Sequence, residues 1–231
     1  MTAIGDAQVE RTLPEWSLAF VEPTAAQAAQ LPEQWRPIAL AADAGARCRL
    51  ARSLWSRGFL AAVPRFAAAL ATRCADVRAC IVHDCPALVY VMADDDGGHV
   101  SWVGYDPREF GPVPEFWQSF PASLRVFLRE VHAGFVSGAD GASFGPARPV
   151  HMVSLARFAG FPEGIPGWDE DGRIASTRLL RITSDGGNLH YCLSPDLAPG
   201  DIALVYEGDI DPADFGTTLD ELMMSRFEAR T

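Results

Sequence analysis

The sequence contains no lysine: all 19 basic residues among its 231 are arginines, against 30 acidic residues, and the formal net charge is −11. A strong negative charge repels nucleic-acid phosphates and anionic lipids and attracts basic surfaces. The composition therefore argues against direct binding to DNA, RNA or a membrane, and it favours a basic partner.

The sequence also lacks a long apolar run. Its most apolar stretch, 59–72, is interrupted by Pro64 and Arg65 and falls short of the about 20 residues that span a bilayer. The N-terminus carries Asp6 and Glu10 and lacks the basic-then-apolar order of a secretory signal. The five cysteines are an odd number, which fits free thiols in a reducing compartment. We expect a cytoplasmic protein.

The apolar pattern of the first part predicts helices. Residues 1–37 are rich in proline and tryptophan, and we expect an irregular arm that packs its aromatic residues onto the body. From 41 to about 74 the apolar residues recur at spacings of three and four, so this stretch predicts two helices divided near Gly58 and Pro64. Two later helices are expected over 122–131 and over 217–227, the last capped by Thr217 or Thr218.

The predicted strands arrive as hairpins. The first pairs 87–93 with 99–105 across an Asp-Gly-rich turn, the second pairs 178–183 with 189–193, and 202–206 predicts a further strand. Consecutive hairpins favour an antiparallel sheet, because parallel strands require a helical crossover between them. The expected fold class is α+β, with a mostly antiparallel sheet and helices packed around it.

One short motif suggests an enzyme. Residues 141–145 read Gly-Ala-Ser-Phe-Gly, which fits the G-x-S-x-G elbow of serine hydrolases. That elbow requires a strand before the serine and a helix after it, whereas 135–140 does not resemble a strand and Pro146 and Pro149 follow. A loop is the better interpretation of Ser143, and a serine hydrolase is the less favoured alternative.

Other reactive groups are explained more simply by structure. Cys74, Cys80, His83 and Cys85 only partly match zinc-ligand spacing, and thiols beside a core strand are ordinary. The acidic runs 94–96 and 169–171 fit solvated turns rather than a calcium loop. Nothing places a nucleophile or a carboxylate beside His132, His151 or His190. The sequence thus predicts no catalytic residue, no cofactor and no metal.

Charge is unevenly distributed along the chain. Residues 47–78 are rich in arginine, whereas 185–221 contain no arginine. If the acids of the second stretch share a face, their field would speed association with a basic partner. The alternative is an ordinary solvated surface. The acids of this stretch are Asp185, Asp196, Asp201, Glu207, Asp209, Asp211, Asp214, Asp220 and Glu221.

Four segments of the C-terminal half resemble the SMI1/KNR4 (SUKH) superfamily in order and spacing. They are FPASLRVFLREVHAG (120–134), LLRITSDGGNLHYCL (179–193), DIALVYEGD (201–209) and DFGTTLDELM (214–223). In that superfamily they correspond to a helix, a hairpin, a strand and a closing helix. The resemblance divides the chain into an SMI1/KNR4-like region, 106–231, and a preceding part, 1–105, that comprises the arm, the helices and the first hairpin.

The resemblance implies an α+β fold and a function in binding. Many bacterial members look like immunity proteins that neutralise a cognate toxin, frequently a nuclease, while others look like scaffolds or regulators. We therefore expect a cytoplasmic immunity protein that occludes the active site of a basic toxin. The expected partner-binding residues are the acids Asp196, Asp201, Glu207, Asp209, Asp211 and Asp214 and the aromatic anchors Trp168 and Tyr206.

Overall fold

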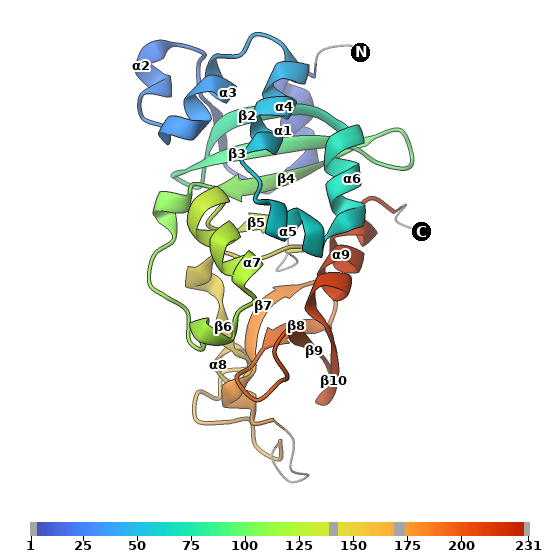
Figure 1. Cartoon of the computed structure of the whole chain (residues 1–231). Coiled ribbons are helices and arrows are strands. Elements are labelled where there is room, and N and C mark those ends of the chain that lie inside the picture. Colours follow the sequence, from blue (N-terminus) through green and yellow to red (C-terminus); the bar gives the residue numbers. More distant parts are fainter. Residues whose placement is uncertain (1–3, 139–142, 169–173, 229–231) are drawn as a thin grey trace.

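The computed structural model describes residues 4–138, 143–168 and 174–228. It is an α+β structure with two five-stranded antiparallel sheets, the first of order β1-β2-β3-β4-β5 and the second of order β10-β9-β8-β7-β6. Figure 1 shows the first sheet in the upper part of the molecule and the second in the lower part. The predicted fold class is confirmed.

The first sheet and the elements around it come mostly from the N-terminal half. Its strands are β1 (Leu18–Phe20), β2 (Cys74–Val82), β3 (Cys85–Ala93), β4 (His99–Tyr105) and β5 (Phe135–Val136). The helices are α1 (Asp6–Thr12), α2 (Ala25–Ala28), α3 (Arg36–Leu40), α4 (Ala44–Ser53), α5 (Arg57–Ala62), α6 (Pro64–Thr72) and α7 (Ala122–Val126), with the short turns η1 (Glu33–Trp35), η2 (Pro107–Glu109), η3 (Trp117–Ser119) and the π-helical η4 (Phe127–Val131).

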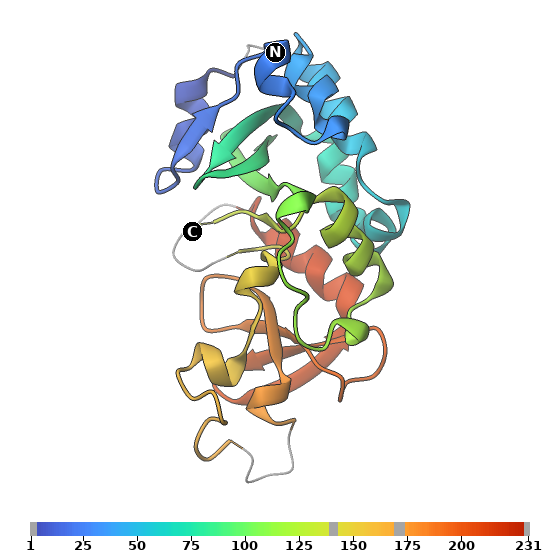
Figure 2. The same ribbon diagram turned by 90° about the vertical axis from the view of Figure 1, so that its left-hand side faces the viewer.

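The second sheet lies wholly in the C-terminal third. Its strands are β6 (Val153–Ser154), β7 (Leu180–Ser184), β8 (His190–Leu193), β9 (Asp201–Tyr206) and β10 (Asp209–Asp214). They are accompanied by α8 (Leu155–Phe158), α9 (Phe215–Ser225), η5 (Pro149–His151) and η6 (Ser176–Arg178). Figure 2 places the helices α4 to α7 along one side of the molecule. Within the described residues, no helix is long and apolar enough to cross a membrane.

Several predicted elements differ from the structure. The arm 1–37 is more regular than predicted, because it also contains α1 and β1. The short segment expected between Thr24 and Gln30, with Thr24 as its cap, is found as α2, and the arm buries Trp35 as expected. The stretch 41–74 forms three helices rather than two, and Gly58 lies inside α5 because Ser56 caps that helix. Pro64 begins α6, as proline does at a first helical position. The last helix begins earlier than predicted, since its cap is Asp214 and not a threonine.

The strands β2, β5 and β10 were not predicted, and β5 lies in the stretch 135–140, which was expected not to form a strand. β2 carries Asp76 and Arg78, which break the apolar pattern of a strand, and Asp76 is almost completely buried. The burial is possible because the guanidinium of Arg47 binds both carboxylate oxygens of Asp76, at 2.7 and 2.8 Å. Such bidentate pairing is the usual condition for a buried charge. A contact between residues so far apart in sequence cannot be read from a local pattern.

A short segment without regular secondary structure, 143–147, joins the two sheets. Phe135 in β5 donates its N–H to the carbonyl of Pro146 at 2.8 Å, and Ala147 donates to the carbonyl of Ile182 in β7 at 2.9 Å. Gly145 lies between them, where a Cβ atom would approach the carbonyl oxygen of Phe135 to 2.4 Å. Only glycine fits that position, so the close approach of the two sheets depends on it.

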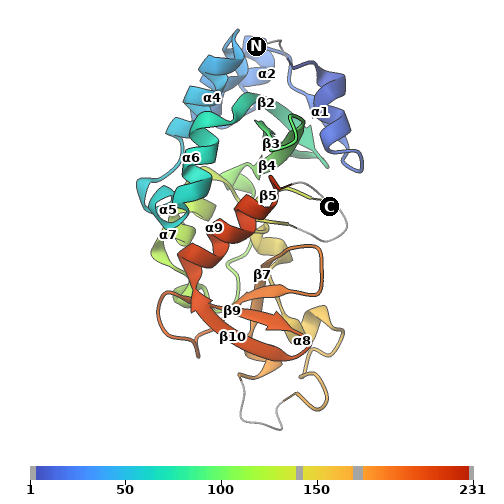
Figure 3. The ribbon, with the colours of Figure 1, turned by 90° about the vertical axis from the view of Figure 1, so that its right-hand side faces the viewer.

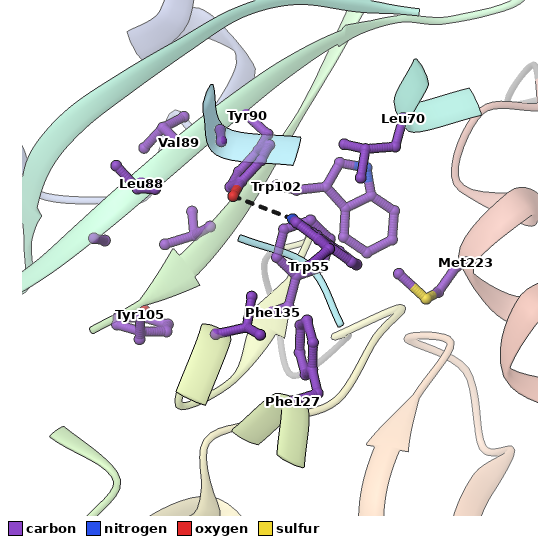
Figure 4. Packing of buried hydrophobic residues seen from close by; sticks show 14 of the residues in the cluster. Trp55, Leu70, Leu88, Val89, Tyr90, Trp102, Tyr105, Phe127, Phe135 and Met223 are labelled. Atoms are coloured by element: carbon purple, nitrogen blue, oxygen red, sulfur yellow. Dashed lines mark hydrogen bonds between the residues drawn. The ribbon is translucent and has the colours of Figure 1, made fainter. Parts of the chain in front are cut away.

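One large hydrophobic core contains residues from both 1–105 and 106–231. Its centre is aromatic (Figure 4): the Trp55 ring lies 5.0 Å from Phe127 and 4.9 Å from Phe135 between centroids. The Trp55 indole donates to the Tyr90 hydroxyl at 3.3 Å, and that hydroxyl bonds His132 Nε2 at 2.8 Å. The Trp55 indole and the Tyr90 hydroxyl are thus partnered inside the core, whereas His132 Nδ1 has no hydrogen-bond partner among the described residues.

The last helix, α9, contacts both halves of the molecule (Figure 3). Asp220 is buried, and its carboxylate accepts the backbone N–H groups of Arg65 and Phe66 at 3.0 and 2.8 Å. The N–H groups of a helix's first turn have no acceptor within the helix, and the carboxylate of Asp220 supplies one for two of these groups in α6. At Gly216, a Cβ atom would meet the carbonyl oxygen of Ala62 at 2.8 Å, so α9 packs directly against the end of α5.

We predict that Asp220→Ala lowers the free energy of unfolding by about 2 kcal/mol, because it leaves the buried N–H of Phe66 and the partly buried N–H of Arg65 without this acceptor. Glu221→Ala removes the neighbouring, exposed carboxylate and should change stability by less than about 0.5 kcal/mol. Urea denaturation of both variants measures the difference. Equal stabilities of the two variants would contradict the role given to Asp220.

A second prediction concerns acid stability. Burial lowers the pKa of His132 to about 3, so the folded protein keeps this imidazole neutral while the unfolded chain takes up a proton below about pH 6.5. Stability contributed at neutral pH is therefore lost as the pH falls from about 6.5 towards 3. We expect the wild type to lose about 2 kcal/mol more than His132→Gln between pH 7 and pH 5.

Urea denaturation of the wild type and His132→Gln at the two pH values provides this measurement, with near-ultraviolet circular dichroism confirming that both proteins are folded. The reference is each protein's own stability at pH 7, so the cost of losing the Tyr90 contact cancels. Identical losses in the two proteins would show that His132 does not set the acid limit.

Candidate functional site

The predicted partner-binding acids centre on the β9–β10 hairpin. Its two-residue turn consists of Glu207, with φ of 48°, and Gly208, with φ of 94°; positive values at both positions define the tight turn that suits a right-twisted hairpin. β10 is the outermost strand of the second sheet. The hairpin therefore presents its acids at the rim of the sheet.

The strand register divides these acids between two faces. Tyr206 lies opposite Asp209, and Leu204 lies opposite Asp211, so these side chains share one face of the hairpin. Asp201 and Asp214 are also opposite each other, but their side chains share the other face, because side chains alternate along a strand, and they lie at the other end of the hairpin. The structure thus brings Tyr206, Glu207, Asp209 and Asp211 together, and we call these four residues the hairpin surface.

The hairpin surface is exposed to solvent. Glu207, Asp209 and Asp211 are exposed, and Tyr206 leaves 51% of its surface accessible. An accessible tyrosine with carboxylates around it is a common composition for a protein interface, because tyrosine contributes both apolar contact and a hydroxyl. This arrangement can attract and hold a cationic surface.

Two of the predicted acids stabilise the fold. Asp196 binds the guanidinium of Arg178 through both carboxylate oxygens, one of them at 2.6 Å, and this hydrogen bonding lowers its pKa. Asp214 accepts the N–H of Thr217 at 2.8 Å as the cap of α9, which lowers its pKa as well. The field that these two acids present to a partner is correspondingly weaker.

The two predicted aromatic anchors have different environments. Tyr206 is exposed at the end of β9, whereas Trp168 is half-buried and packs on a second, smaller core that contains Leu155, Leu179 and Val205. The Trp168 indole donates to the carbonyl of Ile174 at 2.9 Å. Trp168 thus serves the packing beneath the second sheet, and Tyr206 is the anchor that remains on the surface.

A cleft of about 560 Å³ lies beside the other end of β9. The segment 118–122 forms one wall, the loop 194–201 between β8 and β9 forms the other, and Asp201 contributes to the lining. Since Asp201 begins β9 and Tyr206 ends it, the cleft and the hairpin surface lie at opposite ends of the same strand. Asp201 is therefore separate from the hairpin surface.

The serine motif does not form a nucleophile elbow. Gly141 and Ala142 lie outside the described residues, and Ser143 belongs to the irregular segment 143–147 that joins the sheets. Its hydroxyl bonds the Thr183 hydroxyl at 2.9 Å and accepts the N–H of Ser184 at 3.2 Å. The contacts found for Ser143 therefore hold β7 in place, and none of those between described residues joins it to a histidine.

The thiols and histidines singled out in the sequence are spread over the structure. Cys80 is buried, and burial raises its pKa. His83 occupies the β2–β3 turn, where its ring lies 5.6 Å from Trp16, and His132 belongs to the aromatic core. Among the described residues, no three His, Cys, Asp or Glu side chains are grouped so as to hold a metal ion. The acidic run 169–171 lies outside the described residues.

Comparison with protein-family models, with curated proteins and with solved structures finds no match to this chain. The site is therefore interpreted from its own geometry. Sequence reasoning found the acids but missed β10, and with it the pairing that places Asp209 and Asp211 beside Tyr206 and Leu204. The Glu-Gly pair at 207–208, placed between alternating residues, was the available signal for this hairpin.

We predict that a fluorophosphonate probe does not label Ser143, because its contacts support β7 rather than activate an oxygen. Ser143→Ala should instead lower stability by about 1 kcal/mol through the loss of its hydrogen bonds. Mass spectrometry of the treated wild type and urea denaturation of the variant provide the two measurements. Labelling that disappears in Ser143→Ala would identify a reactive serine and overturn this view.

Proposed function

We propose that this protein is a cytoplasmic immunity protein that binds a cognate bacterial toxin of basic charge, such as a nuclease, and blocks its active site. The observation that carries the proposal is the hairpin surface: Tyr206, at the end of β9, is exposed beside the carboxylates of the turn and of β10, the outermost strand of the second sheet. Binding, rather than chemistry on a small substrate, is what this arrangement can perform.

The net charge supports the choice of partner. With −11 over the whole chain, a basic protein approaches through an attractive field, and exposed carboxylates on a rim orient it before contact. Many toxins that act on nucleic acids carry such a basic surface, because they must approach phosphates. An acidic inhibitor then competes with the nucleic acid for the same groups.

The resemblance noted in the sequence also supports the proposal. Its four segments fold as a helix (α7 and η4), a hairpin (β7 and β8), a strand (β9) and a helix (α9), the order that the SMI1/KNR4 layout implies. Four segments found in the expected order are stronger evidence for a resemblance than a single short motif is. The immunity function follows from this resemblance and from the charge, and it requires a direct test.

The test of function uses co-expression. A toxin domain encoded beside the gene of this protein is expressed alone or together with it, and growth is followed. We expect growth to be restored only in the presence of this protein. Continued toxicity, with both proteins shown to be present and folded and failing to bind each other, would reject the immunity proposal.

The test of the surface uses the purified toxin domain and measures association rates. The triple variant Glu207→Arg, Asp209→Arg, Asp211→Arg should associate at least about tenfold more slowly at low salt, because the steering field is reversed. The difference should shrink as salt screens the charges, since the Debye length is about 10 Å at 0.1 M. Tyr206→Ala should mainly accelerate dissociation.

The matched control reverses the same number of charges elsewhere. Glu10, Glu22 and Glu33 are exposed and belong to the N-terminal part, so Glu10→Arg, Glu22→Arg, Glu33→Arg has the same net charge as the hairpin variant. Its association rate should stay closer to that of the wild type. If both triple variants slow association equally, overall charge and not the hairpin surface directs the encounter.

A further inference from the structure

A basic and aromatic group lies on the second sheet, at the strands away from the hairpin surface. We name it the Arg181 cluster: Arg148, His151, Phe158, Arg181 and His190. Arg181 is in β7, paired with Val153 of β6 on one side and with Cys192 of β8 on the other. Phe158 ends α8, and His190 begins β8. Phe158, Arg181 and His190 thus lie together, whereas the guanidinium carbon of Arg148 lies 4.7 Å from the centre of the Tyr105 ring.

The contacts within the cluster are close. The guanidinium carbon of Arg181 lies 3.9 Å above the centre of the Phe158 ring. The imidazole of His190 approaches the same ring edge-to-face, with centroids 5.2 Å apart. Phe158 nevertheless leaves 49% of its surface accessible. A guanidinium stacked by its face keeps the N–H groups of its edge available, which is the geometry that binds oxyanions in two parallel hydrogen bonds.

The positive charge of the cluster is not balanced within the described part of the chain. None of the ion pairs between described residues includes Arg148 or Arg181. Arg148 Nε and His190 Nδ1 are buried without a hydrogen-bond partner among those residues. Buried polar atoms usually have a partner, but Trp35 Nε1, Trp102 Nε1 and His132 Nδ1 also have none among the described residues. The two atoms therefore support an anion site only together with the stacked guanidinium of Arg181.

The lowered pKa values of His151 and His190 also indicate an excess of positive charge around them. Burial first, and then the charges of Arg148 and Arg181, lower the pKa of His151. Burial and then Arg181 lower the pKa of His190, against an opposing effect of Asp185. Both imidazoles lie close enough to Arg181 to sense its charge. An anion placed between these groups would relieve the repulsion and favour their protonated forms.

We propose that the Arg181 cluster binds a single phosphate group, as free inorganic phosphate or as a phosphate ester. The guanidinium edge of Arg181 would hold two phosphate oxygens, and the two histidines would supply further positive charge on protonation. The net charge of −11 opposes polyanions at long range but not a compact oxyanion in direct contact, because charge-assisted hydrogen bonds act at short distance. This inference does not depend on the toxin-binding proposal.

The experiment follows the imidazole signals of His151 and His190 by NMR during titration with sodium phosphate, against sodium chloride at equal ionic strength. We expect a saturable change with phosphate only and a rise in both imidazole pKa values. Arg181→Gln should weaken binding at least about tenfold, since it removes charged hydrogen bonds. Equal responses to phosphate and chloride would overturn the proposal.

A matched control separates this site from arginine stacking in general. Arg129 lies 3.8 Å above the Phe110 ring, nearly the same geometry as the Arg181–Phe158 pair, but in η4 on another part of the molecule. Arg129→Gln should bind phosphate as the wild type does. Loss of binding in this variant, or full binding in a folded Arg181→Gln, would place phosphate elsewhere and reject the Arg181 cluster.

Phenyl phosphate distinguishes the two sources of phosphate. If the site receives an ester with an aromatic group, the exposed Phe158 ring adds stacking, and phenyl phosphate should bind several-fold more tightly than inorganic phosphate. Phe158→Leu should then abolish that advantage. If the site receives free phosphate, the two compounds should bind equally and Arg181→Gln should weaken both. Binding of neither compound would reject the site.

Discussion

The buried carboxylate of Asp220 joins the two halves of this fold. It projects from α9, which follows the last strand of the second sheet, and it accepts the first free N–H groups of α6, which packs on the first sheet. A buried carboxylate is stable only with such donors. Since α9 is capped by Asp214 at the end of β10, the position of the hairpin surface is linked through one helix to the core of the first sheet.

Local patterns predicted those elements whose reason for forming is local. The hairpin of β3 and β4 and the helix over 122–131 have consistent periodicity, and they are found as expected. β2 was missed because Asp76 is stabilised by Arg47, 29 residues away in sequence. The arm was mistaken for irregular chain because its short helices and β1 are stabilised by packing on the core. Sequence alone does not show that a buried charge or a short element is stabilised by residues far away in the chain.

The candidate site illustrates the same limit. The sequence supplies a run of acids without arginine, but it does not say which of them the fold uses. The structure assigns Asp196 to Arg178, Asp214 to the cap of α9 and Asp220 to the first turn of α6. Glu207, Asp209 and Asp211 stay on the surface because β10 is an edge strand. The Arg181 cluster had no sequence signal, since its members are spread over 148–190 and become neighbours only through the sheet.

Charges on an edge strand have two physical consequences. An uncovered edge offers free N–H and C=O groups to any extended chain, and carboxylates together with Pro212 in β10 discourage such pairing. The same carboxylates attract a basic folded surface, which needs no strand addition. Edge protection is therefore compatible with the proposed partner recognition by the same hairpin. An exposed Tyr206 adds nothing to edge protection, whereas the proposed interface would gain contact area from it.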